Sequence, residues 1–169
     1  MIPSPAPLVS VIIPTRNRPG LLQRAVDSVV AQTYRPIEIV IVDNASDVPV
    51  SVRSGDLACI VHRNARMLKA APNRNLGVAR SNGELVAFLD DDDTLLPAKF
   101  SLLVAALDGV ELSYGNTRMV GHAGRELGLN RGRGGIDKLL HYRYIHPNAT
   151  VMRRGAFEAV RFDEGMTTY

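Results

Sequence analysis

The sequence predicts an α/β fold in which a mostly parallel sheet is covered by helices on both faces. Apolar, β-branched runs alternate with segments of helical periodicity along most of the 169 residues. The runs are apolar at nearly every position, which is typical of strands buried on both faces. Parallel strands also need long crossover connections, and the helical segments lie between the runs as such connections require.

Composition places the chain among ordinary globular proteins. Hydrophobic residues make up 46% of it and charged residues 22%, with a formal net charge of +3. These values indicate one domain with a sizeable core. The positive excess forms no dense basic stripe, so no nucleic-acid partner is expected. The single cysteine, Cys59, lies in an apolar run and is expected to be an inert core residue.

Targeting signals are absent from the sequence as printed. Residues 1–7 are rich in proline, carry no charged side chain and lack the long apolar stretch of an export signal. No stretch approaches the roughly 20 apolar residues that are needed to cross a bilayer. A cytoplasmic location is therefore expected, with peripheral contact to a membrane left open.

The first ninety residues carry the clearest structural signals. Leu8 to Ile13 is a β-branched run that Pro14 stops, which predicts a first strand. Residues 19–32 place apolar side chains at i, i+1, i+4 and i+5, so one helix face is apolar. The elements expected next are strands over 37–42 and 56–62, a helix over 72–82 with proline in its first turn, and a strand over 85–89.

The second half gives weaker signals. A helix opened by proline is expected over 97–107, and a fifth strand over 110–114. Residues 124–135 are rich in glycine and arginine, which predicts a flexible loop or a lid over a phosphate-bearing ligand. A late strand over 149–153 and a short helix over 155–160 complete the expected order.

Four carboxylates in a row, Asp90 to Asp93, directly follow the apolar run 85–89. Like charges on adjacent residues repel, and folding gains nothing from four of them together. At the carboxyl end of a buried strand they can seat a hard divalent cation such as Mg²⁺ or Mn²⁺. The alternative is an acidic, solvated loop.

Polar clusters also follow the first two predicted strands, at residues 14–18 and 43–46. Because the carboxyl ends of parallel strands share one edge of a sheet, all three clusters should converge there, and together they indicate a nucleotide site. Asp43 can accept from a base N–H, and Thr15 and Asn17 can hydrogen-bond base or ribose. Asn17 would equally suit a helix cap, while Asn44 and Ser46 would suit a turn.

Taken together, these segments resemble the inverting nucleotide-sugar glycosyltransferases of glycosyltransferase family 2, which have the Rossmann-like GT-A fold. The resemblance runs from Val9 to Tyr169 and rests on the order and spacing of four segments, residues 9–18, 38–46, 74–77 and 83–93. It implies an extended segment over 1–7, a nucleotide-sugar-binding subdomain over 8–115, and the start of an acceptor-binding subdomain over 116–169.

The resemblance also implies roles for the nucleotide-binding residues. Pro14, Thr15 and Asn17 would lie along the nucleotide pocket. Asp43 would contact the base, which in such enzymes is most often uracil. Arg74 would lie near the base and the phosphates, although a surface position on a helix is the alternative.

For the metal, the resemblance implies that Asp90 and Asp92 form the D-x-D signature. Asp92 would be the direct ligand of Mn²⁺ or Mg²⁺, and Asp90 or Asp91 would contact the ribose or the metal's waters. His146 would approach the donor sugar or the metal, or else serve a structural role. The expected reaction is inverting glycosyl transfer from a nucleotide-sugar, most often a UDP-sugar.

The resemblance leaves the catalytic base and the acceptor open. In the family the base is usually an aspartate in a Glu-Asp pair, a few residues beyond a Phe-Asp-Glu segment. Here that segment is residues 162–164, so the base is expected beyond Tyr169. The acceptor hydroxyl would belong to a glycan, lipid, protein or small molecule.

Two other functions fit the residues. A nucleotide-sugar-binding fragment without transferase activity would need no base. A haloacid-dehalogenase-type phosphatase would use Asp90 as nucleophile and Asp92 as acid/base, since Asp90-x-Asp92-x-Thr94 matches its first motif.

Overall fold

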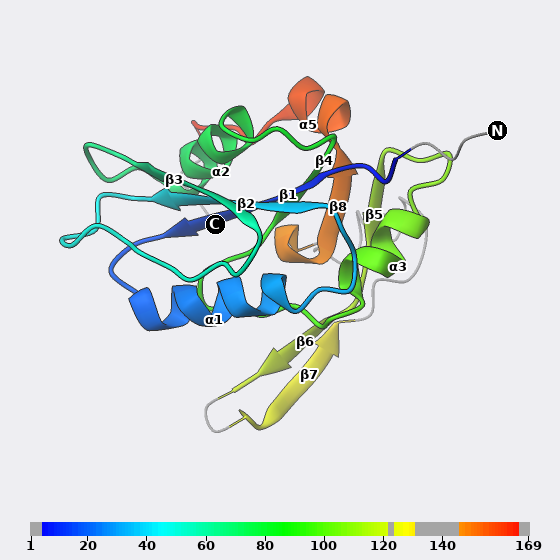
Figure 1. Cartoon of the computed structure of the whole chain (residues 1–169), viewed down its shortest axis with the longest axis horizontal. Helices are drawn as coiled ribbons and strands as arrows, with labels where there is room; N and C mark the ends of the chain where they lie inside the picture. Colours follow the sequence, from blue (N-terminus) through cyan, green and yellow to red (C-terminus); the bar gives the residue numbers. More distant parts are fainter. Residues whose placement is uncertain (1–4, 122–123, 131–145, 166–169) are drawn as a thin grey trace.

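The computed structural model describes residues 5–121, 124–130 and 146–165 (Figure 1). Its central sheet has six strands in the order β3-β2-β1-β4-β8-β5. The strands β3, β2, β1 and β4 run parallel to one another, whereas β8 is antiparallel to both β4 and β5. The predicted mostly parallel α/β sheet is therefore confirmed. The strands are β1 (Val9–Thr15), β2 (Ile37–Asp43), β3 (Ala58–Arg63), β4 (Leu85–Phe88), β5 (Leu112–Tyr114) and β8 (Thr150–Arg153).

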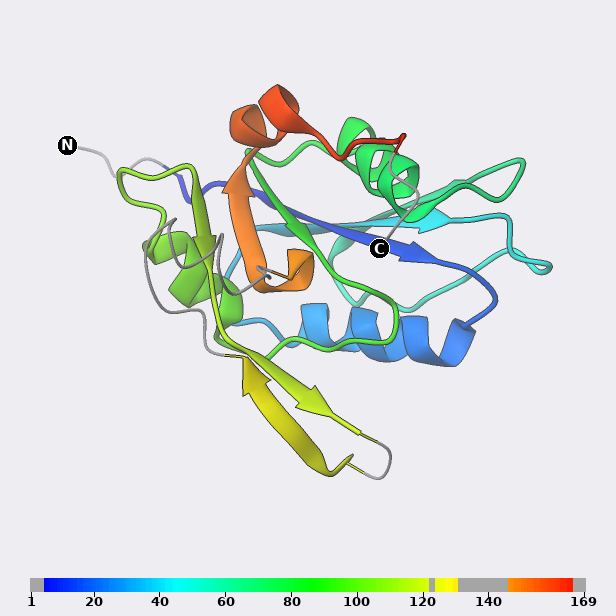
Figure 2. The same ribbon diagram turned by 180° about the vertical axis from the view of Figure 1, so that it is seen from behind.

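Helices cover both faces of the sheet, as predicted (Figures 1 and 2). Successive side chains of a strand point to opposite faces, so β1 contributes to two cores. Val11 and Ile13 pack with one pair of helices, and Ile12 packs with the other pair. The first pair is α1 (Pro19–Val30) and α3 (Lys99–Ala105), and the second is α2 (Ala70–Ala79) and α5 (Arg154–Val160).

These helices are short. The longest of those described, α1, has 12 residues. Within the described ranges, none is both long and apolar enough to cross a membrane. The helix α2 lies close to β1 at Gly77. A Cβ atom at this position would come within 2.2 Å of Ile12 Cγ2.

The second sheet corrects the expectation of a loop over 124–135. Residues Glu126–Asn130 form β7, which pairs antiparallel with β6 (Thr117–Val120) in a hairpin that projects from the body (Figure 2). Strand pairing supplies a hydrogen-bonded ladder that composition does not reveal, and Gly128 fits opposite Met119 in the register. Residues 131–135 lie outside the described part of the chain.

The turn between α2 and β4 is held from both sides. Glu38 accepts hydrogen bonds from the Ser10 hydroxyl at 2.6 Å and from the Gly83 N–H at 3.1 Å. Burial acts to raise the pKa of Glu38, but hydrogen bonds from Ser10, Asn82 and Gly83 outweigh it and lower the pKa. On the other side, Arg154 donates to the Gly83 carbonyl at 2.7 Å. The turn therefore fixes where β4 begins, and so where the aspartate run emerges.

A 3-10 turn, Pro147–Ala149, leads into β8. Its Ala149 N–H donates to the His146 carbonyl, and the Thr150 hydroxyl donates to the Pro147 carbonyl at 2.8 Å. Because β8 inserts between β4 and β5, this turn comes to lie beside the end of β4. The predicted subdomain boundary after residue 115 stays a prediction.

Candidate functional site

The structure brings the three polar clusters together at the carboxyl edge of the parallel strands. The Thr15 hydroxyl, at the end of β1, donates to Asp91 Oδ2 at 2.6 Å. The Asn17 N–H donates to the Ser46 hydroxyl oxygen at 3.0 Å, which joins the segment after β1 to the segment after β2. Residues separated by 29 and 76 positions in the sequence thus meet at one edge.

The middle two aspartates of the run contact the segment after β1. Asp91 is buried, and Arg18 Nη1 donates to its Oδ1 at 3.1 Å. The same nitrogen donates to Asp92 Oδ2 at 3.2 Å, and 54% of the Asp92 side chain is exposed. The hydrogen bond and charge of Asp91, with a smaller contribution from Asp92, raise the pKa of Arg18. Arg18 therefore neutralises part of the acidic run.

The outer two aspartates contact other elements. Arg74 Nη2, from α2, donates to Asp90 Oδ1 at 2.7 Å. The Asn148 amide donates to Asp90 Oδ2 at 3.2 Å and also to Asp93 Oδ2. Burial and the charges of neighbouring aspartates raise the pKa of Asp93, although the Asn148 hydrogen bond opposes them. A single amide thus lies between two like-charged carboxylates.

Three residues converge in a way that fits a divalent cation. Asp90, Asp93 and His146 each offer one ligand atom, and these atoms lie within 4.8 Å of one another. Carboxylate oxygens suit Mg²⁺ and Mn²⁺, and imidazole is a common ligand of transition metals. Beside them, the buried Asn148 Oδ1 has no hydrogen-bond partner among the described residues. Asp92 is not part of this group, so its role as the direct ligand stays a prediction.

Asp43 offers an acceptor at the end of β2. It is fully buried, and its Oδ1 accepts the Ser46 N–H at 2.9 Å. Its Oδ2 has no hydrogen-bond partner among the described residues, and Arg63 Nε lies 3.7 Å away. A buried carboxylate oxygen without a donor is costly unless something pairs with it. This oxygen suits a base N–H, which would compete with the Arg63 guanidinium.

Asparagines shape the loops beside Asp43. Asn44 accepts the Leu68 N–H at 2.7 Å and donates to the Leu68 carbonyl at 2.8 Å, which is the local role that the sequence allowed for it. Asn17 does not cap α1. Its φ of 56° turns its side chain toward the loop after β2, where it exchanges two hydrogen bonds with Asp47. The contact of Asn17 and Pro14 with a nucleotide stays a prediction.

Some residues of this edge were not predicted from the sequence. Arg18 and Arg63 contact the predicted aspartates, and their only signal was their place just after a strand or at its end. Lys99 Nζ donates to the Asn148 carbonyl, and burial, opposed by the charge of Asp93, lowers the pKa of Lys99 to about 8. No local pattern pointed to Asn148 or Lys99.

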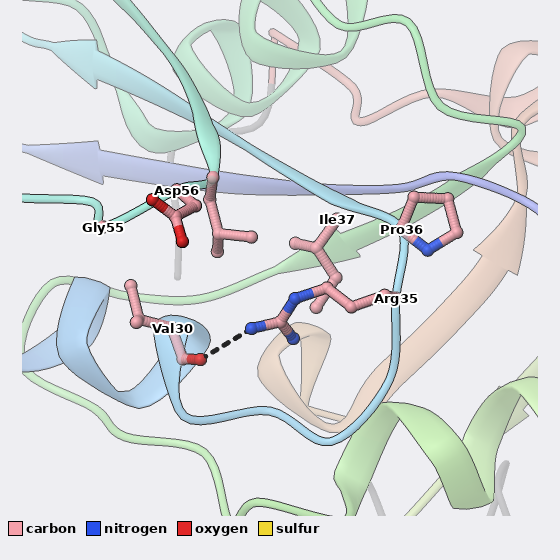
Figure 3. A pocket seen from close by; sticks show the side chains of 7 residues that line it. Val30, Arg35, Pro36, Ile37, Gly55 and Asp56 are labelled. Atoms are coloured by element: carbon pink, nitrogen blue, oxygen red, sulfur yellow. Dashed lines mark hydrogen bonds between the residues drawn. The ribbon is translucent and has the colours of Figure 1, made fainter.

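A cavity of about 490 Å³ lies at the opposite edge, where β2 and β3 begin (Figure 3). The Arg35 guanidinium beside it already donates to the carbonyls of Val30, Gln32 and Tyr34. Asp56 is the other charged residue of its lining. The predicted site residues are not among the residues that line this cavity, so it is not the candidate site.

Comparison with known proteins agrees with this geometry. The family model described as Glycosyl transferase family 2 matches residues 10–161. GalNAc(5)-diNAcBac-PP-undecaprenol beta-1,3-glucosyltransferase of Campylobacter jejuni is 38% identical over 117 residues, 65% of this chain and 38% of that protein. UDP-Glc:alpha-D-GlcNAc-diphosphoundecaprenol beta-1,3-glucosyltransferase WfaP of Escherichia coli is 33% identical over 116 residues, 64% of this chain and 45% of that protein. The chain therefore spans less than half the length of these relatives.

Solved structures share the fold. TarS from S. aureus in complex with UDP superposes with a TM-score of 0.72 at 18% identity, over 95% of this chain and 51% of that one. The mannosyltransferase PcManGT from Pyrobaculum calidifontis, solved with GDP-Man and Mn²⁺, gives a TM-score of 0.62 at 21% identity, over 95% of this chain and 48% of that one. Both likenesses support a GT-A architecture.

Proposed function

Because this chain belongs to glycosyl transferase family 2, we propose that it binds a nucleotide-sugar, a UDP-sugar in particular, for inverting transfer to an acceptor hydroxyl. The observation that carries the proposal is the convergence of Asp43, Thr15 and the aspartate run at one edge of the sheet. Open α/β sheets bind their ligands at this edge. The name of WfaP, which gives UDP-Glc as the donor, and the UDP complex of TarS support the choice of UDP.

The nucleotide would occupy the edge between β1 and β2. Asp43 Oδ2 accepts an N–H of the uracil, while Thr15, Asn17 and Pro14 line the ribose side. Arg74 lies beside Asp90, where its guanidinium can face the phosphates.

A divalent cation, Mn²⁺ or Mg²⁺, fits the aspartate run. Asp90 and Asp92 are the proposed ligands from the D-x-D signature, with Asp93 and His146 within reach of Asp90. A bound cation would neutralise the charge that the leaving diphosphate gains. Arg18 presents a half-exposed guanidinium to Asp91 and Asp92 and can transfer its hydrogen bonds to phosphate oxygens.

We place the catalytic base and most of the acceptor site outside residues 1–169. The two named relatives act on undecaprenyl-linked glycans, which favours a glycan hydroxyl as the acceptor. Nucleotide-sugar binding without glycosyl transfer is the second candidate function, because none of the residues that the structure describes is proposed as the catalytic base. Family membership removes the reason to prefer phosphatase chemistry at Asp90 and Asp92.

Calorimetric titration of UDP, with GDP and dTDP as comparators, tests the proposal with and without Mn²⁺. Tighter binding of UDP than of GDP or dTDP, enhanced by Mn²⁺, is the expected result. Turnover of a UDP-sugar in the presence of undecaprenyl-linked glycans would then separate an enzyme from a binding protein. Absence of binding for all three nucleotides under both conditions would overturn the proposal.

A further inference from the structure

Asn148 connects the two ends of the loop between β4 and α3, residues 89–98, which contains the four aspartates. Its side-chain amide donates to Asp90 and Asp93 at the start of the loop. Its main-chain carbonyl accepts from Lys99, which begins α3 at the end of the loop. One residue of the 3-10 turn therefore contacts both the beginning of this loop, through its side chain, and the first residue of α3, through its main chain.

Because the Asn148 amide donates to both carboxylates, its position sets the distance between Asp90 and Asp93. Asp90 and Asp93 repel each other, and an N–H₂ group between them offsets that repulsion with two hydrogen bonds. The position of that group depends on where the turn sits. The Asn148 side chain is buried, so the turn cannot shift without moving the amide off the carboxylates.

Lys99 is the side chain that ties this turn to α3. Its ammonium is partly buried over the Phe100 ring, 5.8 Å from the ring centre, and points at the Asn148 carbonyl. A cation that has lost part of its hydration is retained only where it is paired. The pairing here is with a main-chain carbonyl, which fixes backbone position without contacting the carboxylates' oxygens.

We propose that Lys99 is a positioning residue of the donor site, which holds the Asn148 carbonyl so that the Asn148 amide sets the spacing of Asp90 and Asp93. This inference rests on the proposed function, because it gives the two carboxylates their purpose as cation ligands. Lys99 holds the Asn148 carbonyl and is not itself a ligand of the cation, although its charge also acts on Asp93. Partners that orient ligands in this way typically contribute roughly 10-fold to 100-fold in metal affinity.

A double-mutant cycle of Lys99→Met and Asn148→Ala tests it, with Mn²⁺ affinity read from the electron paramagnetic resonance signal of free Mn²⁺. Lys99→Met keeps an unbranched side chain of similar length and removes the donor. We expect it to weaken Mn²⁺ binding by up to about 10-fold, against the opposite effect of removing a positive charge near Asp93, and to weaken it no further once Asn148 is alanine. Arg153→Met is the matched control, because Arg153 donates to the carbonyls of Val110 and Leu107 at the far end of β8.

A second readout does not depend on the metal. In ¹⁵N-labelled protein, the side-chain amide resonance of Asn148 should shift toward its ordinary position in Lys99→Met and stay unchanged in Arg153→Met. If Lys99→Met fails to fold, Lys99→Gln carries the same comparisons, because its side chain is uncharged and ends one atom short of the lysine ammonium.

The outcomes separate the two proposals. Wild-type protein that binds neither Mn²⁺ nor UDP contradicts the proposed function, whatever the amide resonance shows. Wild-type protein that binds Mn²⁺, with Lys99→Met binding equally well or with additive losses in the double variant, contradicts the role of Lys99 alone. An unchanged Asn148 amide resonance in Lys99→Met also contradicts that role.

Discussion

Replacing Glu38 by glutamine should destabilise the fold by an amount that depends on pH. The Glu38 carboxylate accepts from the Ser10 hydroxyl at 2.6 Å, from the Asn82 main-chain N–H at 2.5 Å and side-chain amide at 3.0 Å, and from the Gly83 N–H at 3.1 Å. Only 4% of the residue is exposed. These bonds orient the turn that delivers β4 and the aspartate run. Glutamine has nearly the same shape but carries no charge, and its amide nitrogen cannot accept the hydrogen bond from the Asn82 side chain.

The size of the loss follows from those four bonds and from the cost of burying the charge. A hydrogen bond to a charged group contributes about 1 kcal/mol more than a bond between neutral groups, and burial offsets part of the sum, so Glu38→Gln should lower the free energy of unfolding by about 1 to 3 kcal/mol at neutral pH. The pKa of Glu38 is lower in the folded protein than its ordinary value of 4.5. The unfolded chain therefore takes up its proton first as the pH falls. The charge-dependent contribution is complete above that ordinary value and is lost as the pH drops through the folded pKa.

Urea unfolding of wild-type protein and Glu38→Gln between neutral and acidic pH measures this difference. Glu84→Gln is the matched control, because Glu84 is exposed in the same turn and should change stability by less than about 0.5 kcal/mol. The two curves should approach each other in acid. A difference that stays constant with pH, or a loss no larger than that of Glu84→Gln, would refute the reasoning.

Other predictions concern the core, the site and the thiol. Gly77→Ala should cost about 1 to 3 kcal/mol of stability by urea unfolding, since the new methyl group would overlap Ile12; a neutral effect would mean that α2 lies farther from β1. Asp43→Asn should weaken UDP binding by roughly 1.5 to 3 kcal/mol in calorimetry, and equal affinity would remove Asp43 from the base contact. Asp92→Asn should abolish the Mn²⁺ enhancement of UDP binding with an unchanged melting temperature; retained enhancement would leave Asp93 and His146 as the partners of Asp90. Burial raises the pKa of the partly buried Cys59 thiol, so at neutral pH it should react with a disulfide reagent more slowly in the folded protein than after denaturation, and equal rates would contradict that.

The central strands could be predicted because their physical setting leaves a local signature. β1 and β2 are buried on both faces, so nearly every position is apolar, and polar residues begin where the strands end. The hairpin of β6 and β7 carries no such signature. Its side chains are mostly exposed, and its second strand lies within a glycine- and arginine-rich stretch that reads as a loop.

The candidate site likewise contains residues that the sequence predicts and residues that it does not. Thr15, Asp43 and the aspartates follow strands directly, so sheet topology alone brings them together. Asn148 reaches Asp90 across 58 residues, and only because β8 enters the sheet antiparallel between β4 and β5. That insertion leaves no trace in the local sequence. Which aspartate side chains face each other within the run also depends on the backbone of the loop, which residue types do not reveal.

A crystal structure of the protein with UDP and Mn²⁺ would test the central claim most directly. We expect the uracil against Asp43, with Mn²⁺ on Asp90 and at least one of Asp92 and Asp93. A nucleotide at the opposite edge, in the cavity lined by Arg35 and Asp56, would contradict the claim. So would a diphosphate bound at the aspartate run without a cation ligand from that run.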